Sequence, residues 1–324
     1  MNHKLDLKDK KLLYALDLNS RQSFNELSRK LNLSKTATLY RVSNLKKEGI
    51  IKQFQTVINF GKLGFIGFRL YLKLQGATPQ KKEEIINFFK QKDIVAWVVS
   101  IEGEYDIGVL ILSRTIKEMS NLWNEILAMY VNFIKDRFLA IMAHVSYFSR
   151  AYLLDLKQNV YEINLITEPE NIEVDEKDKK ILRLMASDGR ISIIDISSKV
   201  KLTPKTVIQR IKKLEEKKII VGYRTLFDLE KLGYKYFKIH FKLTNITTEK
   251  DKKFRSFVKA NPNIVYNDVV LGGDDYEIEL QVKNLDELRN TLDKIYQEFA
   301  GIIREHKVMQ YYKEHKFLLF PSDI

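Results

Sequence analysis

Hydrophobic and polar positions follow the same order twice along the chain. Shifting the sequence by 169 residues aligns Leu5–Leu74 with Val174–Leu243 without a gap, and 22 of these 70 positions are identical. Each copy begins with an amphipathic pattern of helical period, over residues 5–18 and 174–186, and two further helical patterns follow. The chain is therefore predicted to consist of two copies of one structural unit.

The third helical pattern of each copy has a well-defined start. Ser34 and Thr203 are predicted N-caps, because a hydroxyl there accepts a hydrogen bond from the first turn, and Pro204 suits the first helical position. Inward positions then recur at intervals of 4 and 3 residues, which predicts one buried stripe per helix. These positions are Thr38, Val42 and Leu45 in the first copy and Val207, Ile211 and Leu214 in the second.

A shorter helical pattern precedes each cap, at Phe24–Leu31 and Ile193–Val200, and only two residues separate it from the cap. Two helices at this spacing predict a helix-turn-helix, whose second helix can enter a DNA major groove. A helical hairpin that only packs against its neighbours is the alternative interpretation.

The distribution of charge favours the helix-turn-helix. The 324-residue chain has 55 Lys and Arg against 42 Asp and Glu, a net charge of +13. Residues 1–60 hold 12 basic and 5 acidic side chains, and residues 170–229 hold 14 and 10. Most of the positive excess therefore lies in the two helix-turn-helix segments, as expected of modules that bind a polyanion.

The second part of each copy alternates strand and helix patterns in the order β-α-β-β-α-β, which predicts a ferredoxin-like domain. In the first copy the predicted elements span residues 65–74, 80–90, 94–101, 105–112, 116–129 and 137–148. In the second copy they span residues 234–243, 249–259, 264–271, 276–282, 285–299 and 303–312. Strands that are apolar on more than one face predict that the two sheets bury each other. The faces expected to meet include Phe138, Ile141, Phe237 and Phe241.

The chain is thus predicted to be an α+β protein that forms a pseudo-dimer within one chain. Its segments are a winged helix-turn-helix domain at 1–60, a ferredoxin-like domain at 61–154, a linker at 155–173, a second helix-turn-helix domain at 174–229 and a second ferredoxin-like domain at 230–324. Cysteine is absent, and neither a signal peptide nor 18 consecutive apolar residues occur. We therefore expect a cytoplasmic protein without a membrane span.

Several stretches resemble the Lrp/AsnC (feast/famine) family of transcription regulators. They are LDLKDKKLLYAL at the start, LNLSKTATLYRVSNLKKEGII and VKLTPKTVIQRIKKLEEKKII in the motifs, KLGF and KLGY after them, and the turns GEYD at 103–106 and GGDDYE at 272–277. The second turn is interpreted as holding one extra residue. Family members usually carry one unit per chain, so this chain resembles a fused pair, and whether such pairs associate further is left open.

The resemblance implies binding to double-stranded DNA and a response to a small molecule, often an amino acid, between the ferredoxin-like domains. Ligand-binding residues are then expected at the two turns. They are Gly103, Tyr105, Asp106, Gly273, Asp275 and Tyr276. Hairpin turns without a ligand are the alternative, because glycine is common in such turns.

DNA contacts are expected from the outward face of the second motif helix in each copy. The candidates are Lys35, Thr36, Tyr40, Arg41, Ser43, Lys46 and Lys47 in the first copy, and Lys205, Thr206, Gln209, Arg210, Lys212 and Lys213 in the second. Arg41 and Arg210 are equivalent, and bracing of the motif or phosphate contact is the alternative to base contact for both. Because the other outward residues differ between copies, the two DNA half-sites are expected to differ.

Two other functions are compatible with this architecture. Sirohaem decarboxylases resemble the same family, can occur as fused pairs, and imply a segment with His and Arg near a Tyr-Asn-Leu-Trp run. The corresponding stretches here, AWVVSIEGEYDIGVLI and YNDVVLGGDDYEIEL, contain neither His nor Arg. The chain is therefore expected not to be an enzyme and to have no catalytic residue, cofactor or metal site. A non-specific architectural DNA-binding protein is the remaining alternative.

Overall fold

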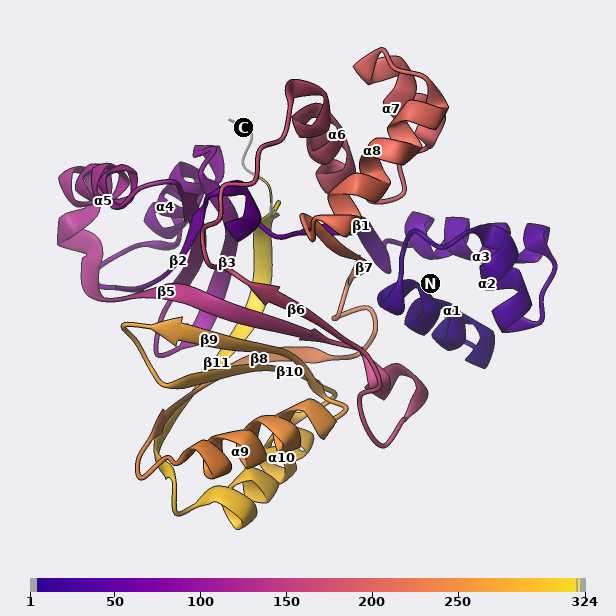
Figure 1. Ribbon diagram of the computed structural model, residues 1–324. Coiled ribbons are helices and arrows are strands. Elements are labelled where there is room, and N and C mark those ends of the chain that lie inside the picture. The colour runs from indigo at the N-terminus through magenta and orange to yellow at the C-terminus, as the bar shows by residue number, and fades with distance from the viewer. Residues whose placement is uncertain (1–4, 319, 321–324) are drawn as a thin grey trace.

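Six helices form the two helix-turn-helix units, which lie beside each other at one side of the protein (Figure 1). The first unit comprises α1 (Leu7–Leu18), α2 (Phe24–Leu31) and α3 (Lys35–Lys47), and the second comprises α6 (Glu176–Ser187), α7 (Ile193–Val200) and α8 (Pro204–Glu216). The computed structural model describes residues 5–318 and residue 320. The ends of the first and last predicted domains, residues 1–4 and 321–324, and Leu319 lie outside the described residues.

The predicted caps and buried stripes of α3 and α8 are confirmed. The Ser34 side chain accepts a hydrogen bond from the backbone N–H of Ala37, and the Thr203 side chain accepts one from Thr206. All six inward positions of the two helices are buried. The stripes therefore fix the rotation of each helix about its axis, and with it the face that points outward.

Each unit continues into a strand that packs on the other unit. Strands β1 (Ile51–Ile58) and β7 (Ile220–Phe227) pair with each other in an antiparallel two-stranded sheet. The hydroxyl of Thr56 on β1 donates to the carbonyl of Met185 in the second unit at 2.8 Å. The equivalent Thr225 on β7 donates to the carbonyl of Leu16 in the first unit at 2.9 Å. Each unit thus packs against the strand of the other unit, and an approximate two-fold axis relates the two sets of contacts.

The remaining strands form one nine-stranded sheet rather than two separate sheets. They are β2 (Ile66–Leu74), β3 (Val95–Gly103), β4 (Ile107–Ser113), β5 (Ile134–Phe148), β6 (Glu162–Ile166), β8 (Lys235–Leu243), β9 (Ile264–Leu271), β10 (Tyr276–Val282) and β11 (Ile303–Phe317). Hydrogen-bonded neighbours follow the order β2-β4-β3-β11-β8-β10-β9-β5, and β5 also pairs with β2. Eight strands therefore close into a ring, and each half of the ring keeps the ferredoxin-like strand order.

Two strands of 15 residues, β5 and β11, join the halves. The first part of β5 pairs with β2 of its own half, and its second part pairs with β9 of the other half. Likewise β11 pairs first with β8 and then with β3. The two halves are thus joined edge to edge, and the faces of the sheet that the helices leave uncovered line the interior of the ring.

Four helices cover the outside of the ring, two on each half (Figure 1). These are α4 (Pro79–Gln91), α5 (Ile116–Tyr130), α9 (Thr248–Ala260) and α10 (Leu285–Phe299), and short 3-10 segments lie at Gly61–Leu63, Val131–Phe133 and Ala151–Leu154.

Of the four side chains expected between the sheets, Phe138 packs in the interior. Phe237 and Phe241 instead pack beneath the second pair of helices, and Ile141 is 37% exposed. The prediction was wrong for these three because a strand pattern does not tell which face is covered by helices.

The segment predicted as a linker, residues 155–173, does more than connect the halves. It contains β6, which pairs with the second part of β5 from His144 to Phe148. The sequence analysis did not predict this strand, because five residues with two polar members give a weak alternating pattern.

A buried ion cluster ties the first helix-turn-helix unit to the ring. The carboxylate of Asp17, at the end of α1, lies 2.9 Å from the Nη2 atom of Arg224 on β7 and also pairs with Nη1 of Arg150. The Nε atom of Arg150 in turn donates to Oε1 of Gln281 on β10 at 3.0 Å. All four side chains are buried. The equivalents of Asp17 and Arg224 are Ala186 and Gln55, so the cluster occurs on one side only.

Replacing Asp17 with Ala should lower the free energy of unfolding by about 3 to 5 kcal/mol, because it leaves two buried guanidinium groups without their carboxylate. Denaturant unfolding of purified protein measures this change. Glu176→Ala is the matched control, since it removes an exposed ion pair with Lys179 and should cost no more than about 1 kcal/mol. Equal losses in the two variants would show that the cluster adds no stability.

Candidate nucleic-acid interface and interior cavity

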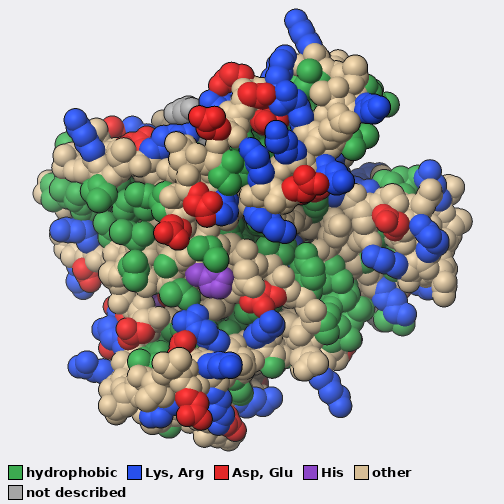
Figure 2. Space-filling view, viewed as in Figure 1, with side chains coloured by type: hydrophobic (Ala, Val, Ile, Leu, Met, Phe, Trp, Pro, Cys, Tyr) green, Lys and Arg blue, Asp and Glu red, His purple; other side chains and the backbone are tan. Residues whose placement is uncertain are grey.

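All thirteen side chains expected to contact DNA lie on α3 and α8, which we call the recognition helices. Ten of them are exposed, whereas Arg41, Thr206 and Arg210 are partly buried. Lys and Arg side chains gather over the second unit and along the first (Figure 2). Both recognition helices therefore present a polar, mainly basic face to solvent.

Arg41 and Arg210 join each recognition helix to the first helix of its unit. Each guanidinium contacts two carboxylates through Nη1, at 2.8 and 2.7 Å for Arg41 and at 2.7 and 2.8 Å for Arg210. The partners are Asp6 and Asp9 for Arg41, and Asp175 and Asp178 for Arg210. The hydrogen bond to Asp9 raises the pKa of Arg41, and that to Asp178 raises the pKa of Arg210. This geometry agrees with the bracing alternative.

Two exposed apolar residues occupy equivalent places on the recognition helices. Leu39 is 40% exposed on α3 and Ile208 is 53% exposed on α8. Each lies between outward positions that the sequence analysis singled out, and aliphatic groups can contact the thymine methyl in the major groove. The sequence analysis missed both, although helical periodicity places them next to Tyr40 and Gln209.

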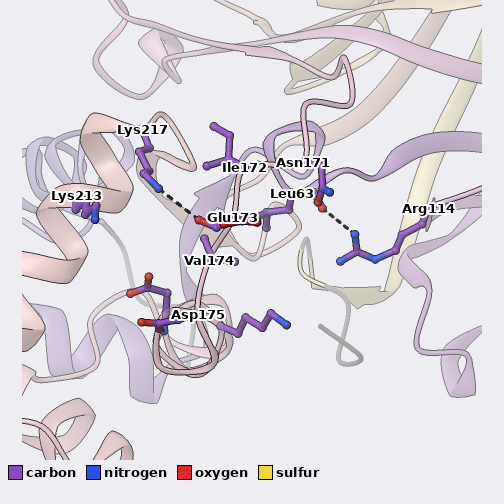
Figure 3. Close-up of a pocket in the computed structure, with 11 residues that line it drawn as sticks. Leu63, Arg114, Asn171, Ile172, Glu173, Val174, Asp175, Lys213 and Lys217 are labelled. Carbon is purple, nitrogen blue, oxygen red and sulfur yellow. Dashed lines mark hydrogen bonds between the residues drawn. The ribbon is translucent and has the colours of Figure 1, made fainter.

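The C-terminal end of α8 borders an open cavity of about 610 Å³ where the second unit meets the first half of the ring (Figure 3). Lys213 lines it from α8, Lys217 from the C-cap of that helix, and Arg114 from the segment before α5. Lys217 donates to the carbonyl of Glu173 at 3.3 Å, and Arg114 donates to the carbonyl of Leu63 at 3.2 Å. Lys213 is therefore the member of the predicted DNA face that lies at this junction.

The two turns predicted to bind a ligand have the same length, so the interpretation of one extra residue is wrong. Asp106 accepts a hydrogen bond from the backbone N–H of Leu74, and Asp275 accepts the equivalent bond from Leu243, both at 2.7 Å. The shift of 169 residues thus continues through the turn. Gly103 corresponds to Gly272, and both have a positive φ.

This alignment separates the six predicted ligand residues. The carboxylates of Asp106 and Asp275 bind backbone within their own halves. Tyr276 faces the outer helices, where its ring lies 4.8 Å from that of Phe254. Tyr105 is buried in the interior, stacked on Tyr71 at 5.4 Å. The glycines Gly103 and Gly273 lie at the interior end of the turns, and the ring of Phe138 occupies the place that a side chain at Gly273 would need. The structure therefore brings only part of the predicted site together.

The ring interior holds a group of buried charges that the sequence analysis did not identify. Lys238 on β8 is fully buried, and its Nζ atom lies 2.8 Å from Glu277 and 3.2 Å from Glu279. It also pairs with Asp268 on β9, which the Nη2 atom of Arg69 contacts from the other half at 3.1 Å. Burial opposes the charged amine, but the three carboxylates raise the pKa of Lys238 well above its ordinary value. Lys238 is therefore a buried cation.

These charges belong almost entirely to the second half of the ring. Tyr71 and Tyr105 of the first half correspond to His240 and Asp274, whose Nδ1 and Oδ2 atoms lie 3.0 Å apart. Gly108 and Leu110 correspond to Glu277 and Glu279. The rings of Tyr71 and His240 lie 5.4 Å apart, so equivalent positions with different chemistry meet in the interior.

A cavity of about 50 Å³ lies beside these charges, between the two halves. Half of its lining residues are aromatic, and Arg69, Asp268 and Glu279 are its charged members. The aromatic members are Phe60, Trp97, Tyr147, Tyr236, Tyr266 and Phe317. Within the described part of the chain, the buried Nε atom of Arg69 has no hydrogen-bond partner. The cavity therefore brings the Nε donor of Arg69 and two carboxylates, both already paired with Lys238, into a largely aromatic and aliphatic wall.

Two further properties hold for residues 5–318 and residue 320. No group of three or more His, Cys, Asp or Glu side chains there has the arrangement of a metal site. None of the helices in this part of the chain combines the length and the apolar character needed to cross a membrane.

Comparisons with known proteins agree with the two motif units. A family profile described as winged helix-turn-helix DNA-binding matches residues 5–52 and again residues 174–221. The leucine-responsive regulatory protein of Haemophilus influenzae is 31% identical over 162 residues, which are 49% of this chain and 97% of that protein. The HTH-type transcriptional regulator Ptr1 of Methanocaldococcus jannaschii is 34% identical over 133 residues, 40% of this chain and 85% of that protein.

One solved structure matches nearly the whole chain. The siroheme decarboxylase NirDL has a TM-score of 0.64 and 12% sequence identity, and the match covers 98% of this chain and 94% of that one. This level of identity shows a shared fold. It also corrects the expectation that the chain is not an enzyme, because an enzyme has the same duplicated architecture. The missing His and Arg in two stretches therefore gave no sound reason to exclude catalysis.

The similarity to these regulators covers the helix-turn-helix and the ferredoxin-like part of one unit. The duplicated fold repeats that unit. The H. influenzae regulator aligns over almost its whole length. The chain therefore belongs to the Lrp/AsnC family of DNA-binding transcription regulators, as a tandem duplication of the family's unit.

Proposed function

We propose that this chain regulates transcription by binding one asymmetric DNA site with both of its helix-turn-helix units. The observation that carries this proposal is that equivalent exposed residues of the two recognition helices differ. Thr36, Tyr40 and Ser43 on α3 correspond to Lys205, Gln209 and Lys212 on α8, and all six are exposed. A regulator of this kind acts on chromosomal DNA, so we also propose a cytoplasmic location.

The chemistry of these residues supports different base preferences under the two units. Lys205 and Lys212 can donate to the O6 and N7 atoms of guanine, and Gln209 can pair with adenine through two hydrogen bonds. The three hydroxyl side chains of α3 offer weaker contacts. Leu39 and Ile208 are the exception to this divergence, since both offer an aliphatic contact to a thymine methyl. The half-sites should therefore share thymine and differ elsewhere.

Selection of binding sites from random DNA should recover a non-palindromic site for one chain, with the stronger base preference under α8. Gln209→Ala should remove one adenine preference, a change of about 1 to 3 kcal/mol in discrimination. Gln91→Ala, which changes an exposed glutamine on α4, is the control and should leave the site unchanged. A perfect palindrome at single-chain spacing, or a site that Gln209→Ala does not alter, would contradict the proposal.

Neutralising two lysines on either recognition helix should weaken DNA binding at all sequences and reduce its dependence on salt. Each lost phosphate contact should lower the slope of log affinity against log salt by about 1. Lys46→Gln with Lys47→Gln, and Lys212→Gln with Lys213→Gln, test the two units separately by binding titrations at several salt concentrations. The control pair, Lys252→Gln with Lys253→Gln, lies on α9. Slopes equal to the control in both variants would count against binding by both units.

We propose further that a small effector, an amino acid as the family resemblance implies, binds between the two halves at the interior cavity. The cavity must widen to admit it, because a volume of about 50 Å³ has room for only one or two water molecules. Among the residues that the structure describes, the Nε atom of Arg69 has no hydrogen-bond partner and can donate to a carboxylate, and Asp268 and Glu279 can accept from an ammonium group. The aromatic wall suits an apolar side chain. Gln281 follows Glu279 by two residues on β10 and binds Arg150, which pairs with Asp17 of the first unit. A ligand beside Glu279 thus has a short path to α1.

Trp97 gives a direct test, because it lines the cavity and the only other tryptophan is Trp123. In a Trp123→Phe background, titration with single amino acids should change the fluorescence of Trp97 for at least one of them. Arg69→Met should abolish that response, because it removes the donor to the carboxylate of the amino acid. The control variant Arg114→Met should retain the response. If no amino acid alters Trp97 fluorescence in the background protein, the effector proposal fails and the DNA proposal stands.

A further inference from the structure

Two equivalent arginines connect the helix-turn-helix units to each other. Arg21 and Arg190 are separated by the repeat length of 169 residues. The Nη1 atom of Arg21 donates to the carbonyls of Gly189 and Ile191 in the second unit, at 2.6 and 3.2 Å. The Nη1 atom of Arg190 donates to the carbonyls of the equivalent residues in the first unit, Ser20 and Gln22. We call these four hydrogen bonds the arginine bracket.

Backbone contacts around the bracket are reciprocal as well. The backbone N–H of Ser20 donates to the carbonyl of Tyr223 on β7 at 3.0 Å, and that of Gly189 donates to Phe54 on β1 at 2.8 Å. A Cβ atom at Gly189 would lie 2.8 Å from the carbonyl carbon of Gln55, so a side chain does not fit without movement. The two units therefore meet through closely packed backbone.

Aromatic rings hold the two guanidinium groups in place. Arg190 lies 4.4 Å from the ring centre of Phe24 and 5.5 Å from that of Phe54. Arg21 lies 5.8 Å from the ring centre of Tyr223. Burial lowers the pKa of Arg190, and the positive charge of Arg21 lowers it further. Two like charges are thus kept near each other, which carbonyl acceptors and aromatic faces on both sides offset.

We infer that the arginine bracket sets the separation and relative orientation of α3 and α8, and thereby the single half-site spacing that the chain accepts. The buried stripes fix each recognition helix within its unit, and the bracket fixes one unit against the other. Arg21 and Arg190 are then positioning residues for DNA recognition. The inference rests on the proposed function for its DNA consequence, but its structural part does not need DNA.

The structural part is tested by measuring the distance between the recognition helices in solution without DNA. Because the sequence has no cysteine, Ser43→Cys with Lys212→Cys gives two unique, equivalent and exposed sites for spin labels. Pulsed electron resonance should give one narrow distance distribution in the full chain. Adding Arg21→Ala and Arg190→Ala should broaden or shift it. Arg29→Ala, which changes an exposed arginine whose Nε atom donates to the carbonyl of Asn25 in the same helix, should not.

The DNA part is tested with the site selected by the unlabelled protein, lengthened or shortened by 1 or 2 base pairs between its half-sites. Each base pair moves the half-sites apart by about 3.4 Å and rotates them by about a tenth of a turn. The unsubstituted chain should lose at least about tenfold in affinity per change. The double alanine variant should bind the spacings with affinities within a few-fold of one another.

A double lysine variant distinguishes the arginine bracket from a simple contact of the two arginines with DNA phosphates. Arg21→Lys with Arg190→Lys keeps both charges but loses the planar group that reaches two carbonyls. Restored spacing preference in this variant would show phosphate contact and overturn the inference. If the double alanine variant does not fold, the single variants Arg21→Ala and Arg190→Ala, each of which removes half of the bracket, replace it and should partly relax the spacing.

Other outcomes are equally distinct. A distance distribution and a spacing preference that the alanine substitutions leave unchanged would overturn the inference. A narrow distribution that the bracket controls, in a chain that binds no preferred DNA sequence, would instead overturn the proposed function and leave the structural part intact.

Discussion

The structure depends on main-chain hydrogen bonds that two long strands make in both halves. β5 and β11 each spend their first part in their own half and their second part in the other. An isolated half would leave the second part of its long strand without a partner, and unpaired edges are costly and prone to aggregation. Closing the ring satisfies these groups and encloses the interior. The helix-turn-helix units, exchanged through β1 and β7, then share one rigid base.

Local signals in the sequence were sufficient for the elements and their order. Caps at Ser34 and Thr203, and stripes of period 3.6, act within one turn or two of the chain, so they can be recognised without tertiary structure. The ferredoxin-like order followed from alternation and from its repetition. The family resemblance, which rests on the same residues, agreed with the family comparison.

Pairing between distant strands could not be predicted in the same way. An alternating strand shows that its two faces differ, but not which face is enclosed, and this explains the error over Phe237 and Phe241. The same ambiguity hid the interior charges: Lys238, Glu277 and Glu279 alternate with apolar residues as solvent-facing residues do. The function of Arg21 and Arg190 was also hidden, because carbonyl acceptors belong to every residue and give no signal in a sequence.

Fusion of two units in one chain allows the sequences of the halves to differ, and the interior charges are one such difference. A symmetric dimer of first halves would enclose two copies of Arg69, whose carboxylate partner Asp268 corresponds to Val99 there. A symmetric dimer of second halves would enclose two copies each of Lys238, Asp268, Glu277 and Glu279, with twice as many acids to accommodate. Each combination would leave a larger excess of one charge than the observed pairing, in which Arg69 and Lys238 face Asp268, Glu277 and Glu279. The interior charges thus make each half complementary to the other half rather than to a second copy of itself.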